Sequence, residues 1–324
     1  MARHFIALLV LCFVSSVFTL AAKAEMPFDD WLAQLRIDAA ASGISQDTIT
    51  KALSNVTLRE KVVKLDRNQP EFKMTYPIYL AKVVTQGRIA EGKRLWKENK
   101  ELLDEIGAHY GVQPRYIVAL WGIESGFGRF TGGFSVVNAL ATMAYDGRRS
   151  AFFRKELIEA LHIIDEGHIS SEAMKGSWAG AMGQCQFMPS SFRAYAVDWD
   201  KDGKTDIWTN KADVFASIAN YLKQARWRDD LTWGRQVKLP DGFDGTTLAD
   251  DKIVKKMDEW RALGITNPDG SPLPARNLSS RLILPDGDEK MAFIAYANFD
   301  SILRWNRSNY FALAVGALSD GMAY

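Results

Sequence analysis

PRYIVALWGIESGFG, residues 114–128, is the most informative stretch of this 324-residue chain. Pro114 suits the first turn of a helix, and three apolar residues that begin with Ile117 recur at i, i+3 and i+4. Glu124 falls at i+7 on the same face, immediately before a glycine-rich break. We therefore predict a helix that ends in a glycine loop and carries a carboxylic acid on its apolar side.

Two interpretations of Glu124 follow from this position. Burial raises the pKa of a carboxyl group, so the acid could stay protonated near neutral pH and donate its proton in catalysis. Alternatively, the carboxylate is structural and is held by nearby backbone groups or by Arg129. Position alone favours neither interpretation, because perturbed acids occur in both settings.

A second segment, residues 175–191, reads KGSWAGAMGQCQFMPSS. Its small residues leave the backbone accessible to a polar ligand. Ser177 and Gln186 offer neutral donors and acceptors, while Trp178 and Phe187 offer flat apolar faces. This mixture suits a sugar ring, and a tight turn packed in the core is an equal alternative.

The third segment, residues 198–209, reads DWDKDGKTDIWT and follows the pattern of a calcium loop. Acids at positions 1, 3, 5 and 9 with glycine at position 6 match the EF-hand loop, in which oxygen ligands surround a hard cation. Position 12 is Thr209 rather than a bidentate Glu, so a downstream acid such as Asp213 would complete the ligand set. We predict calcium binding here, with a solvated Asp-rich turn as the less favoured alternative.

The composition excludes several classes of protein. The chain is 47% hydrophobic and 24% charged, with Lys+Arg 40 against Asp+Glu 39, so it is globular and has no basic arm for nucleic acid. Its histidines lack the spacing of a zinc site, and no motif indicates an organic cofactor.

The first 24 residues are predicted to be a signal peptide. An apolar run from Phe5 to Leu20 precedes Ala22-Lys23-Ala24, which resembles a processing site. A run of 16 residues is short for a membrane span, so an uncleaved anchor is the minority interpretation. Cys12 lies in the leader, which leaves Cys185 as a single, buried thiol that cannot form an internal disulfide.

Most of the remaining chain has helical periodicity, notably at 28–39, 95–110 and 153–164. After Trp233, three turn signals of the Pro-Asp-Gly type divide residues 235–290 into short segments that suit strands or a small lobe. We therefore predict a mostly α fold with a small α+β part.

A last candidate lies near the C-terminus. Asn306 occupies the i+7 position of an apolar stripe that begins at Phe299, and Tyr310 follows at i+11. A ligand in a cleft is one explanation for this Asn, although a helix-capping or core-satisfied Asn is the more common case.

Together, WGIESGFG, KGSWAGAMGQCQFMPSS, DWDKDGKTDIW and RWNRSNYF resemble the membrane-bound lytic murein transglycosylase B family (glycoside hydrolase family 103) in order and spacing. The resemblance extends roughly from Phe28 to Leu318. It implies a lysozyme-like helical core with two additional lobes. The expected divisions are a helical N-terminal lobe at 25–95, a catalytic core at 96–234 with the calcium loop at 198–213, a small inserted lobe at 235–290, and C-terminal helices at 291–324 that complete the core.

The resemblance also implies an activity, namely cleavage of the β-1,4 bond between N-acetylmuramic acid and N-acetylglucosamine in peptidoglycan. Glu124 matches the family's catalytic acid. The positions that line its saccharide groove are matched by Ser177, Gln186, Tyr221, Asn306 and Tyr310, with Trp305 where a Tyr is familiar. Its calcium shell is matched by Asp198, Asp200, Asp202, the Lys204 carbonyl and Asp213, with one extra residue before Asp213.

A single acid suffices if the substrate supplies the nucleophile. We expect Glu124 to protonate the glycosidic oxygen and then to accept the proton of the sugar's C6 hydroxyl, which closes a 1,6-anhydro ring. Asp146, Asp165 and Glu166 are possible second acids, although Asp146 precedes two arginines and is expected to form an ion pair. The alternatives are a lysozyme-type hydrolase and a non-catalytic peptidoglycan-binding scaffold.

The expected setting is the periplasm, with no membrane anchor after removal of the leader. The expected partners are peptidoglycan glycan strands, with other cell-wall enzymes as further candidates and no nucleic acid. Calcium is expected to stabilise the fold rather than to take part in the reaction.

Overall fold

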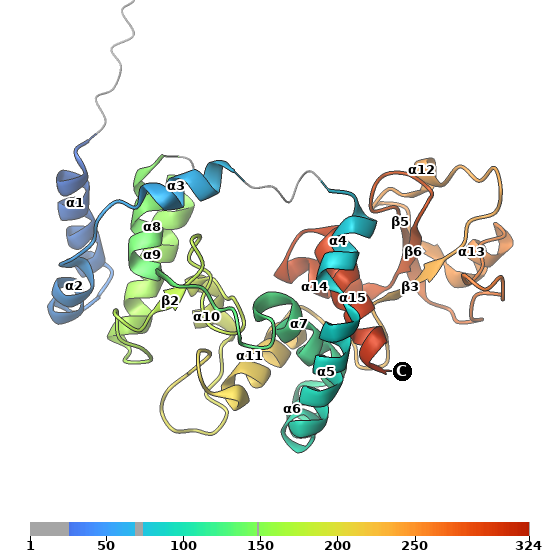
Figure 1. The fold of residues 1–324 in the computed structure, drawn as a ribbon, viewed down its shortest axis with the longest axis horizontal. Coiled ribbons are helices and arrows are strands. Elements are labelled where there is room, and N and C mark those ends of the chain that lie inside the picture. Colours follow the sequence, from blue (N-terminus) through green and yellow to red (C-terminus); the bar gives the residue numbers. More distant parts are fainter. Residues whose placement is uncertain (1–25, 69–73, 148, 324) are drawn as a thin grey trace, which may run out of the picture.

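The computed structural model describes residues 26–68, 74–147 and 149–323, so the expected signal peptide and Cys12 lie outside the described residues. Helices dominate this part of the chain, with a two-stranded and a four-stranded antiparallel sheet (Figure 1). The mostly α prediction is confirmed. Among the described residues, no helix combines the length and the apolar character needed to cross a membrane.

Helix α7 (Pro114–Ser125) lies at the centre of the larger core, and its residues from Tyr116 to Gly122 are all buried. It begins at Pro114 as expected, and Gly126 ends it in the left-handed region at φ 57°. Four helices pack against it: α5 (Gln86–Glu98), α6 (Lys100–Tyr110), α11 (Lys211–Gln224) and α15 (Asn309–Ala323).

The N-terminal helices divide between two parts of this core (Figure 1). The first three, α1 (Phe28–Ala41), α2 (Gln46–Leu53) and α3 (Glu60–Arg67), lie beside α8 (Val136–Tyr145) and α9 (Ser150–Asp165). The next helix, α4 (Tyr76–Val83), packs against α15, as α5 does. The segment expected as one N-terminal lobe therefore covers two separate surfaces of the core.

The apolar stripe at 95–110 falls on two helices, because Asn99 separates α5 from α6. Its side-chain amide donates to the Leu95 carbonyl at 2.7 Å, and its backbone N–H donates to the same carbonyl at 3.1 Å. Asn competes with the backbone in this way and so favours helix ends.

The small lobe is built on a four-stranded antiparallel sheet in the order β3–β6–β5–β4. It has its own core, in which Trp260 and Ile294 are completely buried. Its last strand lies beyond the expected limit of residue 290, because the sequence AFIA is buried on both faces and shows no alternation to mark it as a strand. The strands are β3 (Gly234–Val237), β4 (Lys255–Lys256), β5 (Ser279–Ile283) and β6 (Ala292–Ala295), accompanied by α12 (Gly245–Leu248) and α13 (Met257–Ala262).

The remaining elements are two short paired strands and two helices. Helix α10 packs against α9 and α11, and helix α14 packs against α11 and α15. Their bounds are β1 (Phe134–Ser135), β2 (Lys175–Gly176), α10 (Pro189–Tyr195) and α14 (Ala297–Trp305).

A turn of the small lobe returns to the core through Asp286, which follows β5. Its Oδ1 accepts a hydrogen bond from the Tyr76 backbone N–H at 2.8 Å and another from the Tyr310 hydroxyl. Thr75, the N-cap of α4, makes no side-chain cap of its own. Asp286 therefore caps α4 from another lobe, where a carboxylate also suits the positive end of the helix dipole.

We predict that Asp286→Ala destabilises the protein by about 1 kcal/mol, because two donors lose a shared acceptor. For a chain of this size this lowers Tm by about 2 °C, which differential scanning calorimetry can measure. Asp241→Ala is the matched control, since Asp241 occupies the same Leu-Pro-Asp-Gly sequence and is exposed on the small lobe. Equal Tm values for the two variants would contradict the capping role.

Candidate active site

Glu124 opens into a cavity of about 750 Å³ between α7, the α4–α5 connection and the segment that follows α14. Among the described residues that line this cavity, it is the only carboxylate. The others are Met74, Tyr79, Lys82, Val83, Arg88, Ile123, Asn306, Ser308, Tyr310 and Phe311.

Among the described residues, the carboxyl of Glu124 has one hydrogen-bond partner, the indole N–H of Trp305, which donates to Oε1 at 2.7 Å. Burial raises the pKa of Glu124 to about 8, and the bond from Trp305 opposes that rise. Arg129 does not pair with it, because the Arg129 Nε donates to the Gly126 carbonyl at 3.0 Å. At neutral pH the carboxyl is therefore protonated and can act as a proton donor.

Aromatic packing fixes the direction of the Trp305 indole. Its ring centroid lies 5.1 Å from that of Phe187 and 4.6 Å from that of Tyr221. The Tyr221 hydroxyl in turn donates to the Arg304 carbonyl at 2.7 Å. Trp305 and Tyr221, both expected in the groove, thus form one cluster beside Glu124.

The glycine-rich segment holds the end of α7 in place through Gln184. Its Oε1 accepts from the Trp121 indole N–H at 2.8 Å, and its Nε2 donates to the Trp208 carbonyl at 2.8 Å. Gly128 has φ 81°, and a Cβ there would overlap the side-chain oxygen of Gln184. The Ser125 hydroxyl donates to the Gln184 carbonyl, so the residue after Glu124 is tied to the same segment.

Ser177 and Gln186 lie outside the described lining of the Glu124 cavity. The Ser177 hydroxyl accepts from the backbone N–H groups of Ala179 and Ala181 at 3.2 and 3.0 Å. The Gln186 amide donates to the carbonyls of Thr131 and Gly183 at 3.1 and 2.8 Å. Both side chains stabilise loops in this structure and remain partly exposed.

Asn306 and Tyr310 do line the cavity, although not from one helical face. Helix α14 ends at Trp305, and Asn306 is extended with φ −142°. Its Oδ1 accepts from the Ser308 N–H at 3.1 Å in the turn between α14 and α15, while the Ser308 hydroxyl accepts from the Phe311 N–H and caps α15. Tyr310 lies against Tyr76 and Tyr79, with ring centroids 5.4 and 5.6 Å away.

Sequence reasoning missed the wall opposite Glu124, which comes from the α4–α5 region. Tyr79, Lys82 and Arg88 line the cavity from there. They belong to no motif, and they reach the site only because α4 and α5 pack against α15 and α7.

The three candidate second acids are all engaged elsewhere. Asp146 forms an ion pair with Arg67 at 3.0 Å, as its basic surroundings suggested, although with a different partner. Asp165 accepts from the Ser45 backbone N–H, and Glu166 pairs with Arg193 at 2.9 Å.

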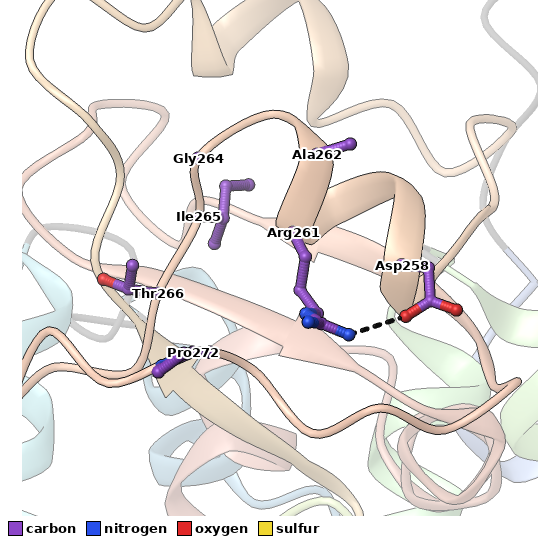
Figure 2. A pocket seen from close by; sticks show the side chains of 7 residues that line it. All are labelled: Asp258, Arg261, Ala262, Gly264, Ile265, Thr266 and Pro272. Carbon is purple, nitrogen blue, oxygen red and sulfur yellow. Dashed lines mark hydrogen bonds and ion pairs between the residues drawn. The ribbon is translucent and has the colours of Figure 1, made fainter.

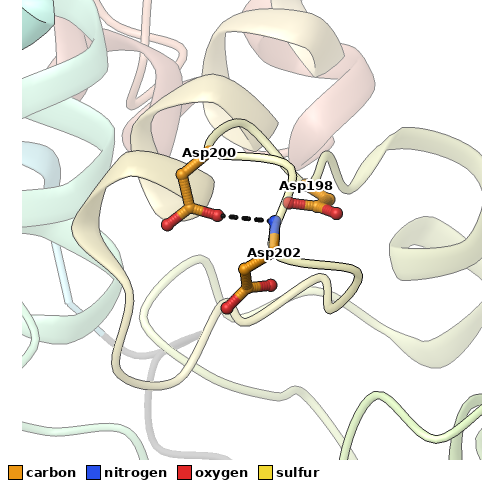
Figure 3. A group of neighbouring side chains, drawn as sticks. All are labelled: Asp198, Asp200 and Asp202. Carbon is orange, nitrogen blue, oxygen red and sulfur yellow. Dashed lines mark hydrogen bonds between the residues drawn. The ribbon is translucent and has the colours of Figure 1, made fainter.

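The predicted calcium loop brings Asp198, Asp200 and Asp202 together (Figure 3), with ligand atoms within 4.8 Å of one another. The Oδ1 atom of Asp198 is buried and has no hydrogen-bond partner in the described structure. Lys204 follows in the same turn, and its N–H donates to Asp202 at 2.8 Å. An unpaired buried carboxylate oxygen among hard oxygen donors fits a calcium ion.

Two further acids of this region have other partners. Asp206 accepts from the N–H groups of Trp208 and Thr209, both at 2.8 Å. Asp213 is buried and accepts from the N–H groups of Trp199 and Asp206 at 2.8 and 2.7 Å. Burial raises the pKa of Asp213 to about 6, against the effect of these two bonds.

Another hollow, of about 680 Å³, lies on the small lobe (Figure 2). Arg261 and Asp258 form an ion pair at 3.0 Å at its edge. None of the predicted site residues lines it.

Known proteins agree with this architecture. A family model described as a transglycosylase SLT domain matches residues 27–320. Membrane-bound lytic murein transglycosylase B of Escherichia coli (strain K12) is 30% identical over 296 residues, which are 87% of this chain and 79% of that protein.

Solved structures are similar over nearly the whole chain. SltB3 of Pseudomonas aeruginosa, in complex with NAG-anhNAM-pentapeptide, has a TM-score of 0.88 and 40% identity, and the match covers 92% of this chain and 80% of that one. Lytic transglycosylase Slt35 of Escherichia coli, in complex with calcium, has a TM-score of 0.77 and 28% identity, covering 90% and 92% of the two chains. The lysozyme-like core is thereby confirmed, and the chain belongs to the transglycosylase SLT domain family.

Proposed function

We propose that this protein is a lytic transglycosylase that cleaves the β-1,4 bond between N-acetylmuramic acid and N-acetylglucosamine in peptidoglycan and leaves a 1,6-anhydromuramic acid end. The observation that carries this proposal is the carboxyl of Glu124, protonated at neutral pH and unaccompanied by another carboxyl among the described residues that line its cavity of about 750 Å³. Most glycosidases pair two carboxylates across the scissile bond, so a site with one acid favours a nucleophile supplied by the substrate.

In this mechanism Glu124 acts first as an acid and then as a base. Its proton passes to the glycosidic oxygen as the bond to C1 of the muramic sugar breaks, and N-acetylglucosamine leaves with a free 4-hydroxyl. The C6 hydroxyl of the same muramic sugar then bonds to C1, and its proton returns to the Glu124 carboxylate. No water is consumed, and the intramolecular hydroxyl has a large proximity advantage over solvent.

Trp305 has a defined part in this cycle. Its indole N–H, 2.7 Å from Oε1, stabilises the carboxylate that exists between the two proton transfers. It leaves the other carboxyl oxygen available to the substrate. We propose that the glycan strand contacts Asn306 and Tyr310 in this cavity, and Ser177, Gln186 and Tyr221 outside its lining.

A structural calcium ion is part of the proposal. Asp198, Asp200, Asp202 and the Lys204 carbonyl would hold it, while Asp213 would complete the site or position the loop through its two backbone bonds. The ion would neutralise the cluster of acids and connect the loop to α11. The proposed location is the periplasm, reached by export through the N-terminal leader.

Glu124→Gln should lower the rate of glycan cleavage by at least about 100-fold, because the general acid and base is lost. Mass spectrometry of fragments released from purified sacculi measures both rate and product, since a hydrolytic end is heavier by one water than an anhydro end. Asp146→Asn is the matched control and should retain activity, because Asp146 pairs with Arg67 outside the cavity. Unchanged clearance by Glu124→Gln would refute the catalytic role, and hydrated ends would identify a hydrolase.

The raised pKa also predicts a pH-dependent stability difference. The carboxyl ionises near 4.5 when the chain is unfolded and near 8 in the native protein, so native stability falls as pH rises between these values. Glu124→Gln removes this dependence. In thermal melts, the Tm of the variant relative to that of the wild type should therefore increase between pH 5 and pH 8. A Tm difference between variant and wild type that stays constant across this range would contradict the raised pKa. Glu101→Gln is the control, because Glu101 is exposed on α6.

Removal of calcium should lower Tm, because an ion that binds only the native state stabilises it by about 3 kcal/mol at 100 times its Kd. Melting curves with calcium and with excess chelator measure the shift. In Asp198→Asn the shift should shrink, since the unpaired Oδ1 is replaced or neutralised. If excess chelator leaves the Tm of the wild type unchanged, the calcium site is refuted, and the catalytic proposal is not affected.

A further inference from the structure

The cavity that contains Glu124 has an excess of positive charge. Arg88 and Lys82 line it, and the only carboxylate among its described lining residues is protonated at neutral pH. Neither cation forms an ion pair with a described residue; the Lys82 amino group lies 3.9 Å from the Met74 sulfur. Among the described residues that line this cavity, no ionised carboxylate balances these two cations.

Arg88 is the better placed of the two, because it is partly buried and held in position. It lies in the first turn of α5, and its Nη1 donates to the Val83 carbonyl at the end of α4. An arginine has five N–H donors in a rigid plane, so one bond to the backbone orients the guanidinium and leaves other donors available.

A second guanidinium lies close to Arg88. Burial lowers the pKa of Arg88, and the like charge of Arg129, in the loop that follows α7, lowers it further. Arg129 donates to the Gly126 carbonyl, and its charge also lowers the pKa of Glu91, one turn further along α5 than Arg88, so Glu91 balances part of this charge. Arg88 has no ion-pair partner among the described residues, and a bound anion would relieve the remaining repulsion between the two guanidiniums.

These cations line the same cavity as the acid but come from different helices. Arg88 lies on α5 and Lys82 on α4, whereas Glu124 lies in the last turn of α7. An anion bound at Arg88 would meet a neutral Glu124, so the two groups would not repel each other.

We propose that Arg88, supported by Lys82 and Arg129, forms an anion subsite that binds a carboxylate of the peptide carried by the substrate glycan. This inference rests on the proposed function, because the sugar rings of the glycan offer no free carboxylate once the peptide is attached. A guanidinium matches a carboxylate in geometry, so the subsite would favour glycan whose peptides carry free carboxylates.

The test compares two substrates, soluble glycan chains whose peptides carry free carboxylates and the same chains after these carboxylates have been converted to amides. Arg88→Gln should lower the ratio of kcat/KM for chains with free peptide carboxylates over chains with amidated ones about tenfold, mainly through KM, since a charge-assisted hydrogen bond is lost. Arg88→Lys, which keeps the charge, should retain part of the preference. Arg94→Gln is the matched control, because Arg94 lies on the same helix outside the cavity and pairs with Glu91 at 2.8 Å.

The outcomes separate the subsite from the proposed function. Equal losses on both substrates would mean that Arg88 only connects α4 to α5, and an unchanged ratio would mean that it binds no peptide carboxylate; either result overturns the subsite. A wild-type protein that cleaves neither substrate would overturn the proposed function, and the subsite with it.

Discussion

The structure depends on the placement of one carboxyl group at the buried end of a helix. Helix α7 is almost entirely enclosed, and its last turn presents Glu124 to a cavity with only an indole N–H as partner. Removing a carboxylate from water without a charged partner is costly, so the group keeps its proton. The surrounding architecture maintains this environment through the Gln184 bonds, the aromatic cluster at Trp305 and the wall formed by α4 and α5.

The residues that could be predicted are those whose relative positions are determined within one short stretch of sequence. Glu124 could be placed because its spacing from Ile117 on one helix is a property of fifteen consecutive residues. The acids of the calcium loop were found for the same reason, as Asp198, Asp200 and Asp202 lie on one turn. Asp206 shows the limit of that reasoning, because its spacing fits the pattern while its side chain accepts backbone bonds instead.

The wall opposite Glu124 could not be predicted, because its residues meet the acid only through the packing of helices distant in sequence. The strand β6 was missed because a fully buried run has no period. Nothing in Leu-Pro-Asp-Gly distinguishes Asp286 from Asp241, yet the former contacts Tyr76 across 210 residues of chain.

The contact of Asp286 has a consequence for modular engineering. The small lobe leaves the core at β3 and returns at β6, two paired neighbours, so it has the topology of a cassette that could be excised at one point. Removal of the lobe would also remove the Asp286 carboxylate. The Tyr76 N–H at the start of α4 and the Tyr310 hydroxyl would then lose the acceptor that they share. A shortened enzyme would need a replacement acceptor grafted at that spot, or the cavity would lose one of its sides.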